Sequence, residues 1–179
     1  MTSPRIKKLE DIISAVVAPV LEGAEFAFDK RKRTFRRQVG VCTQIVNFQA
    51  GVRSMEGLFA VNLGVYHPIY REDSSKIAPQ FPEEPHCLIR ERLSVLRDTM
   101  ITRLFPARFK KSDSFFKWWL ATPTDLWWKF SEESGTTVES LSKVLVLLQS
   151  RGIAWLEANT QEARLREIHE HIQRRLGKI

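Results

Sequence analysis

The densest concentration of charge in the chain is the segment 28–40, FDKRKRTFRRQVG, in which six of the eight positions from 30 to 37 are Lys or Arg. Arginine is well suited to hold a phosphate or a carboxylate, because its planar guanidinium donates two parallel hydrogen bonds. Contacts of this kind position a nucleic acid without reading its sequence. The candidate residues for a site that binds nucleic acid or another anion are Arg31, Arg33, Arg36 and Arg37.

The same segment has a purely structural interpretation, which we favour. Phe26 and Phe28 precede the basic residues and Phe35 follows them, so the pattern predicts two strands joined by a turn near residues 30–33. Lys and Arg at a hairpin tip keep the edge of a sheet soluble and stop it from pairing with other chains. Runs of exposed charge are most often solvated faces rather than sites.

A second basic stretch, residues 103–117, holds five basic residues and one acidic residue. It adds Arg108, Lys110 and Lys111 to the candidates for anion or nucleic-acid binding. The whole chain has 28 Lys and Arg against 21 Asp and Glu, a net charge of +7. This balance favours anionic partners such as nucleic acid or an acidic protein. Nucleic-acid binding requires the two basic stretches to share one face.

Aromatic residues form a second group of candidates, with five tryptophans in 179 residues. Two of them are adjacent in LWWKF, and neighbours on a strand point to opposite faces, so one is expected in the core and one near the surface. Residues 68–86 hold four prolines and no periodicity, which is typical of a functional or mobile surface loop. Exposed aromatic side chains favour a protein–protein hot spot, or a stacking platform for single-stranded nucleic acid. The candidate partner-binding residues are Tyr70, Phe81, Trp127 and Trp128.

The histidines and cysteines do not predict a metal site. Cys42 and Cys87 are isolated in the sequence, so we expect two buried, reduced thiols. His169 and His171 are two residues apart on a predicted helix, about 200° around its axis, which does not suit a shared ion.

Signatures of catalysis are also lacking in the sequence. There is no glycine-rich phosphate loop and no nucleophile elbow, so we expect no cofactor and assign no catalytic residue. An enzyme with a site near His67, facing Glu72 or Asp73 across the following loop, is the third of our functional hypotheses.

The periodicity of apolar residues predicts helices at both ends of the chain and strands between them. Pro19 is expected to kink or end the first helix near Ala18. Thr136 with Glu139 predicts a capping box at the start of the penultimate helix, and Gly152 its C-cap. The expected helices are 4–21, 136–152 and 160–176, with a short one from Ser112 in the irregular segment 98–128. The expected strands are 25–30, 34–39, 41–49, 58–67 and 87–97, with a hairpin loop at 51–57.

This order predicts an α+β fold: an antiparallel sheet of about four to five strands, with one N-terminal and two C-terminal helices packed mainly on one face. The strand LFAVNLGVYH alternates most clearly, with Phe59, Val61 and Leu63 on one side and Asn62 on the other. We expect one domain over residues 1–179. No apolar run approaches the ~20 residues that cross a bilayer, and the N-terminus lacks the order of a signal peptide. We therefore expect a cytoplasmic protein with no membrane contact.

Several pieces of the sequence are shared, in the same order, with a known family. They are APVLEGAEFAFDK leading into TFRR, then IVNFQAG and FAVNLGVYHP, and later LWWKF and LLQSRGIAWLE. They resemble an uncharacterised bacterial family, the domain of unknown function 4304, over roughly residues 5 to 157. The chain departs from the pattern at residues 23–25, where the family tends to place Gly directly before the aromatic residue. The resemblance supports the strand order and implies no established activity.

Three functions remain open at this point. The leading hypothesis is a non-enzymatic binding module, of adaptor or immunity type, that recognises a protein partner. The alternative is a nucleic-acid-binding protein that uses the basic hairpin 30–37. The third is the enzyme with a site near His67. The sequence does not indicate the oligomeric state.

Overall fold

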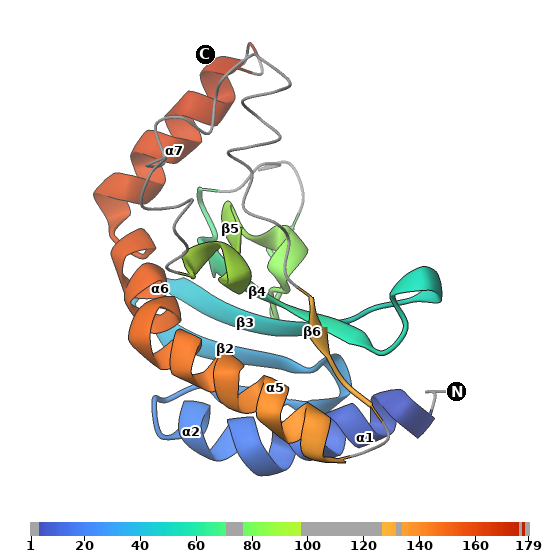
Figure 1. Ribbon diagram of the computed structural model, residues 1–179. Helices are drawn as coiled ribbons and strands as arrows, with labels where there is room; N and C mark the ends of the chain where they lie inside the picture. The colour runs from blue at the N-terminus through green and yellow to red at the C-terminus, as the bar shows by residue number, and fades with distance from the viewer. Residues whose placement is uncertain (1–3, 71–76, 98–126, 132–133, 176, 178–179) are drawn as a thin grey trace.

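The computed structural model describes residues 4–70, 77–97, 127–131, 134–175 and 177. Their core is an antiparallel sheet in the order β1–β2–β3–β4–β5, with a sixth strand, β6, paired with β4 beside β5. Helices α1, α2, α5 and α6 cover one face of this sheet (Figure 1). The predicted α+β class, with its helices on one face, is confirmed.

The helices and strands have short connections, except where undescribed residues intervene. The strands are β1 (Ala27–Asp29), β2 (Thr34–Val39), β3 (Cys42–Ala50), β4 (Leu58–Tyr66), β5 (Ile89–Arg92) and β6 (Trp128–Lys129). The helices are α1 (Pro4–Ile12), α2 (Ala18–Glu22), α5 (Ser134–Leu147), α6 (Ile153–Asn159) and α7 (Glu162–Arg175).

The basic segment forms the turn of the predicted hairpin between β1 and β2. A short 3₁₀ turn, Lys30–Lys32, follows Asp29, whose carboxylate accepts a hydrogen bond from the Lys32 N–H. Arg33 closes the turn in the left-handed conformation, with φ of 51°. The next turn, between β2 and β3, has Gly40 at φ of 57°, where a side chain is disfavoured.

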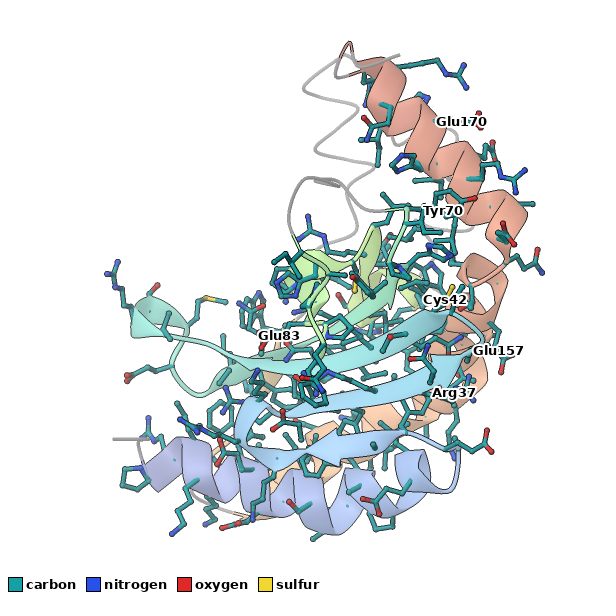
Figure 2. The ribbon with its side chains drawn as sticks, turned by 180° about the vertical axis from the view of Figure 1, so that it is seen from behind. Arg37, Cys42, Tyr70, Glu83, Glu157 and Glu170 are labelled. Carbon is teal, nitrogen blue, oxygen red and sulfur yellow. The ribbon has the colours of Figure 1, made fainter. Side chains whose placement is uncertain are left out.

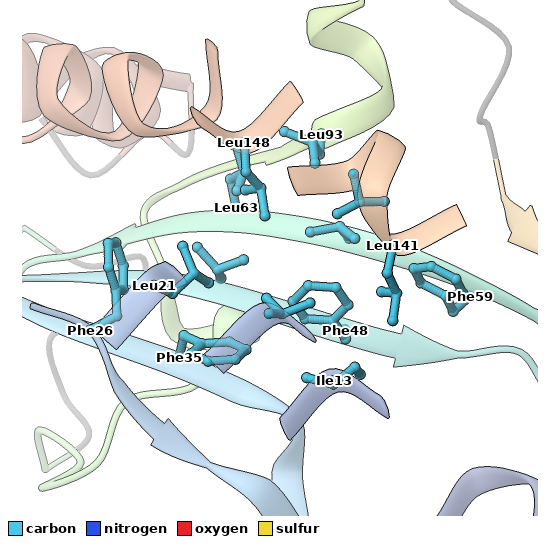
Figure 3. Packing of buried hydrophobic residues seen from close by; sticks show 14 of the residues in the cluster. Ile13, Leu21, Phe26, Phe35, Phe48, Phe59, Leu63, Leu93, Leu141 and Leu148 are labelled. Atoms are coloured by element: carbon cyan, nitrogen blue, oxygen red, sulfur yellow. The ribbon is translucent and has the colours of Figure 1, made fainter. Parts of the chain in front are cut away.

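The two faces of the sheet differ in character because side chains alternate along each strand. On the helix-covered face, residues from β2, β3 and β4 pack against the N-terminal helices α1 and α2 and against helices α5 and α6. Together they form a continuous apolar core (Figure 3). The largest fully buried side chains of this core include Ile13, Leu21, Phe35, Phe48, Phe59, Leu63, Leu141 and Leu148. We call the other side, formed by the alternate positions of β2 to β5, the open face.

A π-helical turn, Ile13–Val17, joins α1 to α2 without a break. The four most buried residues of this helix are spaced by four: Leu9, Ile13, Val17 and Leu21, with Ala18 buried beside Val17. In an ideal α-helix that spacing drifts by about 40° at each step, or about 120° in all. The π-turn holds one extra residue and absorbs most of the drift, so that all four side chains face the core. The helix does not end near Ala18, because α2 continues to Glu22. Pro19 closely follows the π-turn, so its missing N–H falls where the regular α-helical hydrogen bonds are already interrupted.

Helices α5 and α6 are joined in the same way as α1 and α2. A π-turn, Leu148–Gly152, joins α5 to α6, so the helix does not end at Gly152 as predicted. The residues that face the core here are again four apart: Val144, Leu148, Gly152 and Leu156. Gly152 packs closely, because a Cβ there would lie 3.0 Å from both Leu93 Cδ1 and Leu148 Cδ2, and these side chains would have to shift.

Two further boundaries differ from the predictions. Helix α5 begins at Ser134, so Thr136 lies inside it and makes no capping box. Thr137 binds the preceding segment instead: its hydroxyl donates to the Ser131 carbonyl and accepts from the Ser131 N–H. The strand expected over 87–97 is limited to β5, and a 3₁₀ turn follows it because Leu93 turns into the core.

Part of the predictions falls outside the described residues. These are the short helix from Ser112, the irregular segment up to residue 126, and the acidic residues Glu72 and Asp73. None of the helices in the described part of the chain has the length and apolar character that crossing a membrane requires.

Candidate binding surface

The candidate arginines of the basic hairpin do not share one face. Arg33 lies beside α1, where its Nη1 donates to Glu10 Oε1 at 2.6 Å and its Nε donates to the Phe48 carbonyl at 3.2 Å. Arg31 is exposed on the turn itself. Arg33 therefore fastens the hairpin to the first helix, while Arg31 faces solvent.

Arg36 and Arg37 are neighbours on β2 and point to opposite sides of the sheet. Arg37 lies on the helix-covered side, where it donates to Gln44 Oε1 through Nε (2.9 Å) and Nη2 (2.8 Å). It also reaches Glu157 of α6 at 3.4 Å, as Figure 2 shows from behind. Arg36 lies on the open face, where its Nε donates to the Pro82 carbonyl at 2.7 Å. Each guanidinium thus joins segments that are distant in sequence. The other anion-binding candidates, Arg108, Lys110 and Lys111, lie outside the described residues.

Arg36 holds the loop of residues 77–87, which contains the C-terminal part of the proline-rich segment. We call it the fixed loop. Lys32 on the hairpin turn forms an ion pair with Glu83, and its hydrogen bond holds the pKa of that carboxyl below its ordinary value. Within the loop, His86 Nδ1 accepts from the Glu83 N–H at 2.9 Å, and Glu83 in turn caps the short turn that contains His86. The loop is therefore fixed to the open face at several points.

Cys87 anchors the end of this loop against the sheet. Its side chain packs on Gly64 of β4, and a Cβ at position 64 would lie only 2.5 Å from the sulfur. Burial raises the pKa of the Cys87 thiol. Cys42 is buried in the core on the helix-covered face, so both thiols are free and buried, as predicted.

The aromatic candidates differ in their exposure. Phe81 is 65% exposed on the fixed loop. Trp128 is buried and stacks on Phe59, with ring centroids 5.9 Å apart. Trp127, the residue before β6, is partly exposed, and the Arg92 guanidinium lies 5.0 Å from its ring centroid.

Tyr70 connects the end of β4 to helix α7. Its ring stacks on His67 at 4.5 Å and lies 5.6 Å from the ring of His169. Its hydroxyl accepts from Arg166 Nε at 3.3 Å and lies 3.5 Å from a carboxylate oxygen of Glu162. Tyr70 thus docks α7 onto the loop that follows the sheet.

His67 is buried and serves the backbone of the same turn. Its Nδ1 accepts from the N–H groups of Ile69 and Tyr70, each at 3.1 Å. Burial lowers the pKa of His67, and the charge of Glu162 opposes that shift in part. Among the described residues, His67 makes no hydrogen bond to an acid or a nucleophile. The described part of the chain also contains no group of three His, Cys, Asp or Glu that could hold a metal ion.

A polar hollow of about 340 Å³ lies on the open face, between the fixed loop and the β5 edge. Its lining residues come from β3, β4, β5 and the loop: Gln49, Asn62, Glu84, Arg90, Glu91 and Arg92. Arg90 and Glu84 form an ion pair at 4.0 Å across it. Phe81 precedes the lining residue Glu84 by three residues, and the guanidinium of the lining residue Arg92 lies over the Trp127 ring.

A family model, Domain of unknown function (DUF4304), matches residues 17–158. The chain belongs to this family. The match ends where the sequence resemblance ends, and it begins within the first helix rather than near residue 5. No curated protein and no solved structure matches the chain.

Sequence reasoning did not find the residues of the hollow. Gln49 and Asn62 lie in VNFQ and VNLGV, the strand motifs that carry the family resemblance, and Arg90 and Arg92 lie on the next strand. The available signal was polar residues at alternate positions on adjacent strands, all on the face opposite Phe48 and Leu63.

Proposed function

We propose that this protein is a non-enzymatic binding module that recognises a protein partner through Phe81, Trp127 and the polar hollow of the open face. The observation that carries the proposal is Phe81, a large aromatic side chain 65% exposed on a loop held by Arg36 and Lys32. Aromatic anchors of this kind dominate the energetics of protein interfaces.

The fixed loop supports the proposal on energetic grounds. Ordering a loop at the moment of binding costs affinity, and a loop already held in place avoids much of that cost. Here the carbonyl of Pro82, next to Phe81, accepts a hydrogen bond from a partly buried guanidinium of the sheet. A partner would meet the Phe81 ring already in position.

The test is affinity capture from the host of this protein with the wild type and two variants. Phe81→Ala removes the exposed ring, and Val52→Ala removes a side chain that is 68% exposed on the hairpin loop between β3 and β4. We expect a saturable partner that the wild type and Val52→Ala retain and Phe81→Ala loses. A hot-spot aromatic residue is worth about 2 kcal/mol or more, roughly a thirtyfold weaker complex. Absence of a partner, or equal retention by Phe81→Ala, would refute the proposal.

The nucleic-acid alternative gives a different outcome in solution. Arg33, Arg36 and Arg37 already bind protein acceptors, which weighs against a phosphate site at segment 30–37. Fluorescence anisotropy with short DNA and RNA over a salt series separates the two. Micromolar binding that weakens steeply with salt would favour nucleic acid over a protein partner.

A further inference from the structure

A groove of about 480 Å³ lies beside helix α5, and we call it the α5 groove. One wall is a face of this helix and of the π-turn after it, where residues three or four apart point to the same side. The residues of this wall are Thr136, Glu139, Ser140, Lys143, Val146, Leu147 and Ser150. The other wall contains Trp127, Trp128 and Lys129 from the β6 segment, and Arg97, which follows the 3₁₀ turn after β5. The groove extends over about 20 Å, since a helix rises about 1.5 Å per residue.

Hydrogen bonds join the two walls at both ends of the groove. At the start of α5, the Thr137 hydroxyl donates to the Ser131 carbonyl at 3.2 Å and accepts from the Ser131 N–H at 3.1 Å. At the other end, Arg151 Nη1 donates to the Leu96 carbonyl at 3.0 Å. Figure 1 shows β6 next to α5. The groove is therefore formed before a partner arrives, which lowers the cost of ordering on binding.

The α5 groove offers apolar surface to a partner. Val146 lines it and is 67% exposed, and Trp127 and Leu147 are partly exposed. Trp128 gives this wall a fixed position, because it is buried and stacks on Phe59. Exposed apolar side chains that gather in one hollow mark an interaction site, whereas scattered ones do not.

The charged side chains of the groove are mostly basic. Arg97, Lys129 and Lys143 line it, against one acidic residue, Glu139, so the formal charge of the lining is +2. Lys143 and Glu139 form an ion pair at 2.6 Å, with both side chains 68% exposed. An ion pair with this exposure contributes little and is screened by salt. A segment with negative charge is therefore favoured in the groove.

Two other occupants match the lining less well. Residues 98–126, which connect Arg97 to Trp127, hold five basic and three acidic side chains, so their charge has the same sign as that of the groove. A nucleic acid has the opposite sign, but Glu139 opposes its phosphates, and Val146 and Leu147 give them no hydrogen-bond partner. An acidic polypeptide that also carries apolar side chains fits both kinds of lining residue.

We propose that the α5 groove binds an acidic amphipathic helix of a polypeptide partner. The apolar side chains of this helix pack on Val146 and Trp127, and its carboxylates lie beside Lys129 and Lys143. A helix that lies in a groove with apolar anchors three or four residues apart is a recurring mode of recognition. The inference rests on the proposed function and names the chemistry of the partner. Trp127 belongs to both surfaces, because Arg92 of the polar hollow lies over its ring.

The test uses two labelled peptides, one with three repeats of Glu-Leu-Leu-Glu and one in which every Glu is replaced by Lys. As a helix, each is about 18 Å long, close to the length of the groove. Each is titrated with the full chain by fluorescence anisotropy, and the indole N–H resonance of Trp127 is followed by NMR. We expect saturable binding of the acidic peptide, a shift of the Trp127 resonance, and at least about tenfold weaker binding of the basic peptide.

Three results would overturn the proposal. They are equal binding of the two peptides, no saturable binding of the acidic peptide, and tighter binding of a single-stranded oligonucleotide that displaces the acidic peptide. The last result would assign the groove to nucleic acid.

Lys143→Glu reverses a charge in the groove, and Arg164→Glu on α7 is its matched control. Each substitution breaks one exposed ion pair on a helix, with Glu139 at 2.6 Å and with Glu167 at 3.1 Å. Both change the net charge equally, so a general effect of charge cancels. We expect about tenfold weaker binding of the acidic peptide to Lys143→Glu and unchanged binding to Arg164→Glu. Equal loss in both variants would overturn the assignment to the groove.

Val146→Ala tests the apolar contact, with Val52→Ala as its control. The two valines are 67% and 68% exposed, and Val52 lies outside the groove. Alanine favours a helix more than valine does, so the substitution in α5 does not threaten folding. We expect about fivefold weaker binding to Val146→Ala, because two methyl groups are lost from the contact, and no change for Val52→Ala. Unchanged binding to Val146→Ala would contradict the proposed packing.

The outcome is distinguishable from failure of the proposed function. The peptides need no natural partner, so they test the α5 groove alone, whereas the capture experiment tests Phe81. A partner lost by Phe81→Ala together with no binding of the acidic peptide would remove only the groove site. Binding of the acidic peptide without a captured partner would retain the groove site and remove the role of Phe81.

Discussion

The two faces of β3 and β4 are built from the same strands and hold together in different ways. On the helix-covered face, aromatic rings form a continuous row across the sheet, from Phe28 through Phe35, Phe48 and Phe59 to Trp128, with neighbouring centroids 4.2 to 6.1 Å apart. On the open face, Asn47, Asn62 and Gln49 form a row of hydrogen bonds. Apolar burial is non-directional and tolerates small shifts. Hydrogen bonds are directional, so they fix how these amides are oriented on the open face.

The largest expected effect comes from the helix-covered face. Phe48→Ala removes a ring that is fully buried between Phe35 and Phe59, and the cavity left behind adds to the lost burial. We expect the free energy of unfolding to fall by about 3–5 kcal/mol, measured by urea denaturation. Gln49→Ala, one residue along on the open face, is the control and should cost less than about 1 kcal/mol. Equal losses would show that the two faces contribute alike to stability.

The next effect tests how closely the end of the loop 77–87 packs against β4 on the open face. Gly64→Ala places a Cβ against Cys87, and we expect a loss of about 1–3 kcal/mol in unfolding free energy by the same method. Cys87→Ala in the same chain should recover part of this loss, because the sulfur at 2.5 Å is removed. Gly135→Ala is the control: a Cβ there meets nothing within 4 Å, and on helix α5 it should stabilise by up to about 1 kcal/mol. Additive effects at 64 and 87 would mean that these residues do not press on each other.

The smallest effect concerns His67, in the turn after β4 that contacts α7 through Tyr70. The lowered pKa of His67 means that the folded protein binds a proton there less readily than the unfolded chain. Its contribution to stability is therefore complete above the ordinary pKa of 6.5 and is lost as the pH falls below it. His67→Asn keeps an acceptor for the N–H groups of Ile69 and Tyr70 and does not titrate. Urea denaturation from about pH 7 to about pH 5 should show a shallower decline in the variant. Parallel curves would assign the decline to other groups.

The sheet could be predicted from the sequence because a period of two is a local signal. Phe59, Val61 and Leu63 alternate with Ala60 and Asn62, and the register of β4 follows that pattern. Helix boundaries were less predictable. Local rules predict that a helix ends at Pro19 and at Gly152. Both residues lie within continuous helical segments that pack against the sheet.

The candidate site depended on contacts between distant segments, which no local pattern contains. Arg36 and Arg37 are adjacent in sequence and look alike, but one binds the Pro82 carbonyl and the other binds Gln44. The hydrogen-bonded amides could be placed on the open face by alternation. The orientation of the Asn47 amide follows from its hydrogen bond to the Lys32 carbonyl, which lies on the turn between β1 and β2.

The π-helical turn at Ile13–Val17 has a consequence for how the chain can vary in length. Deleting one residue from this turn would leave a regular α-helix in nearly the same phase, because the turn holds the one extra residue. If all of these residues formed a regular α-helix instead, everything before the turn would be rotated by about 100°. Leu9 would leave the core, and Glu10 would swing away from Arg33, 2.6 Å from it in the folded protein. Insertions and deletions in this helix are therefore not equivalent to changes in a surface loop. A single residue sets the angular phase of the N-terminal helix relative to the basic hairpin.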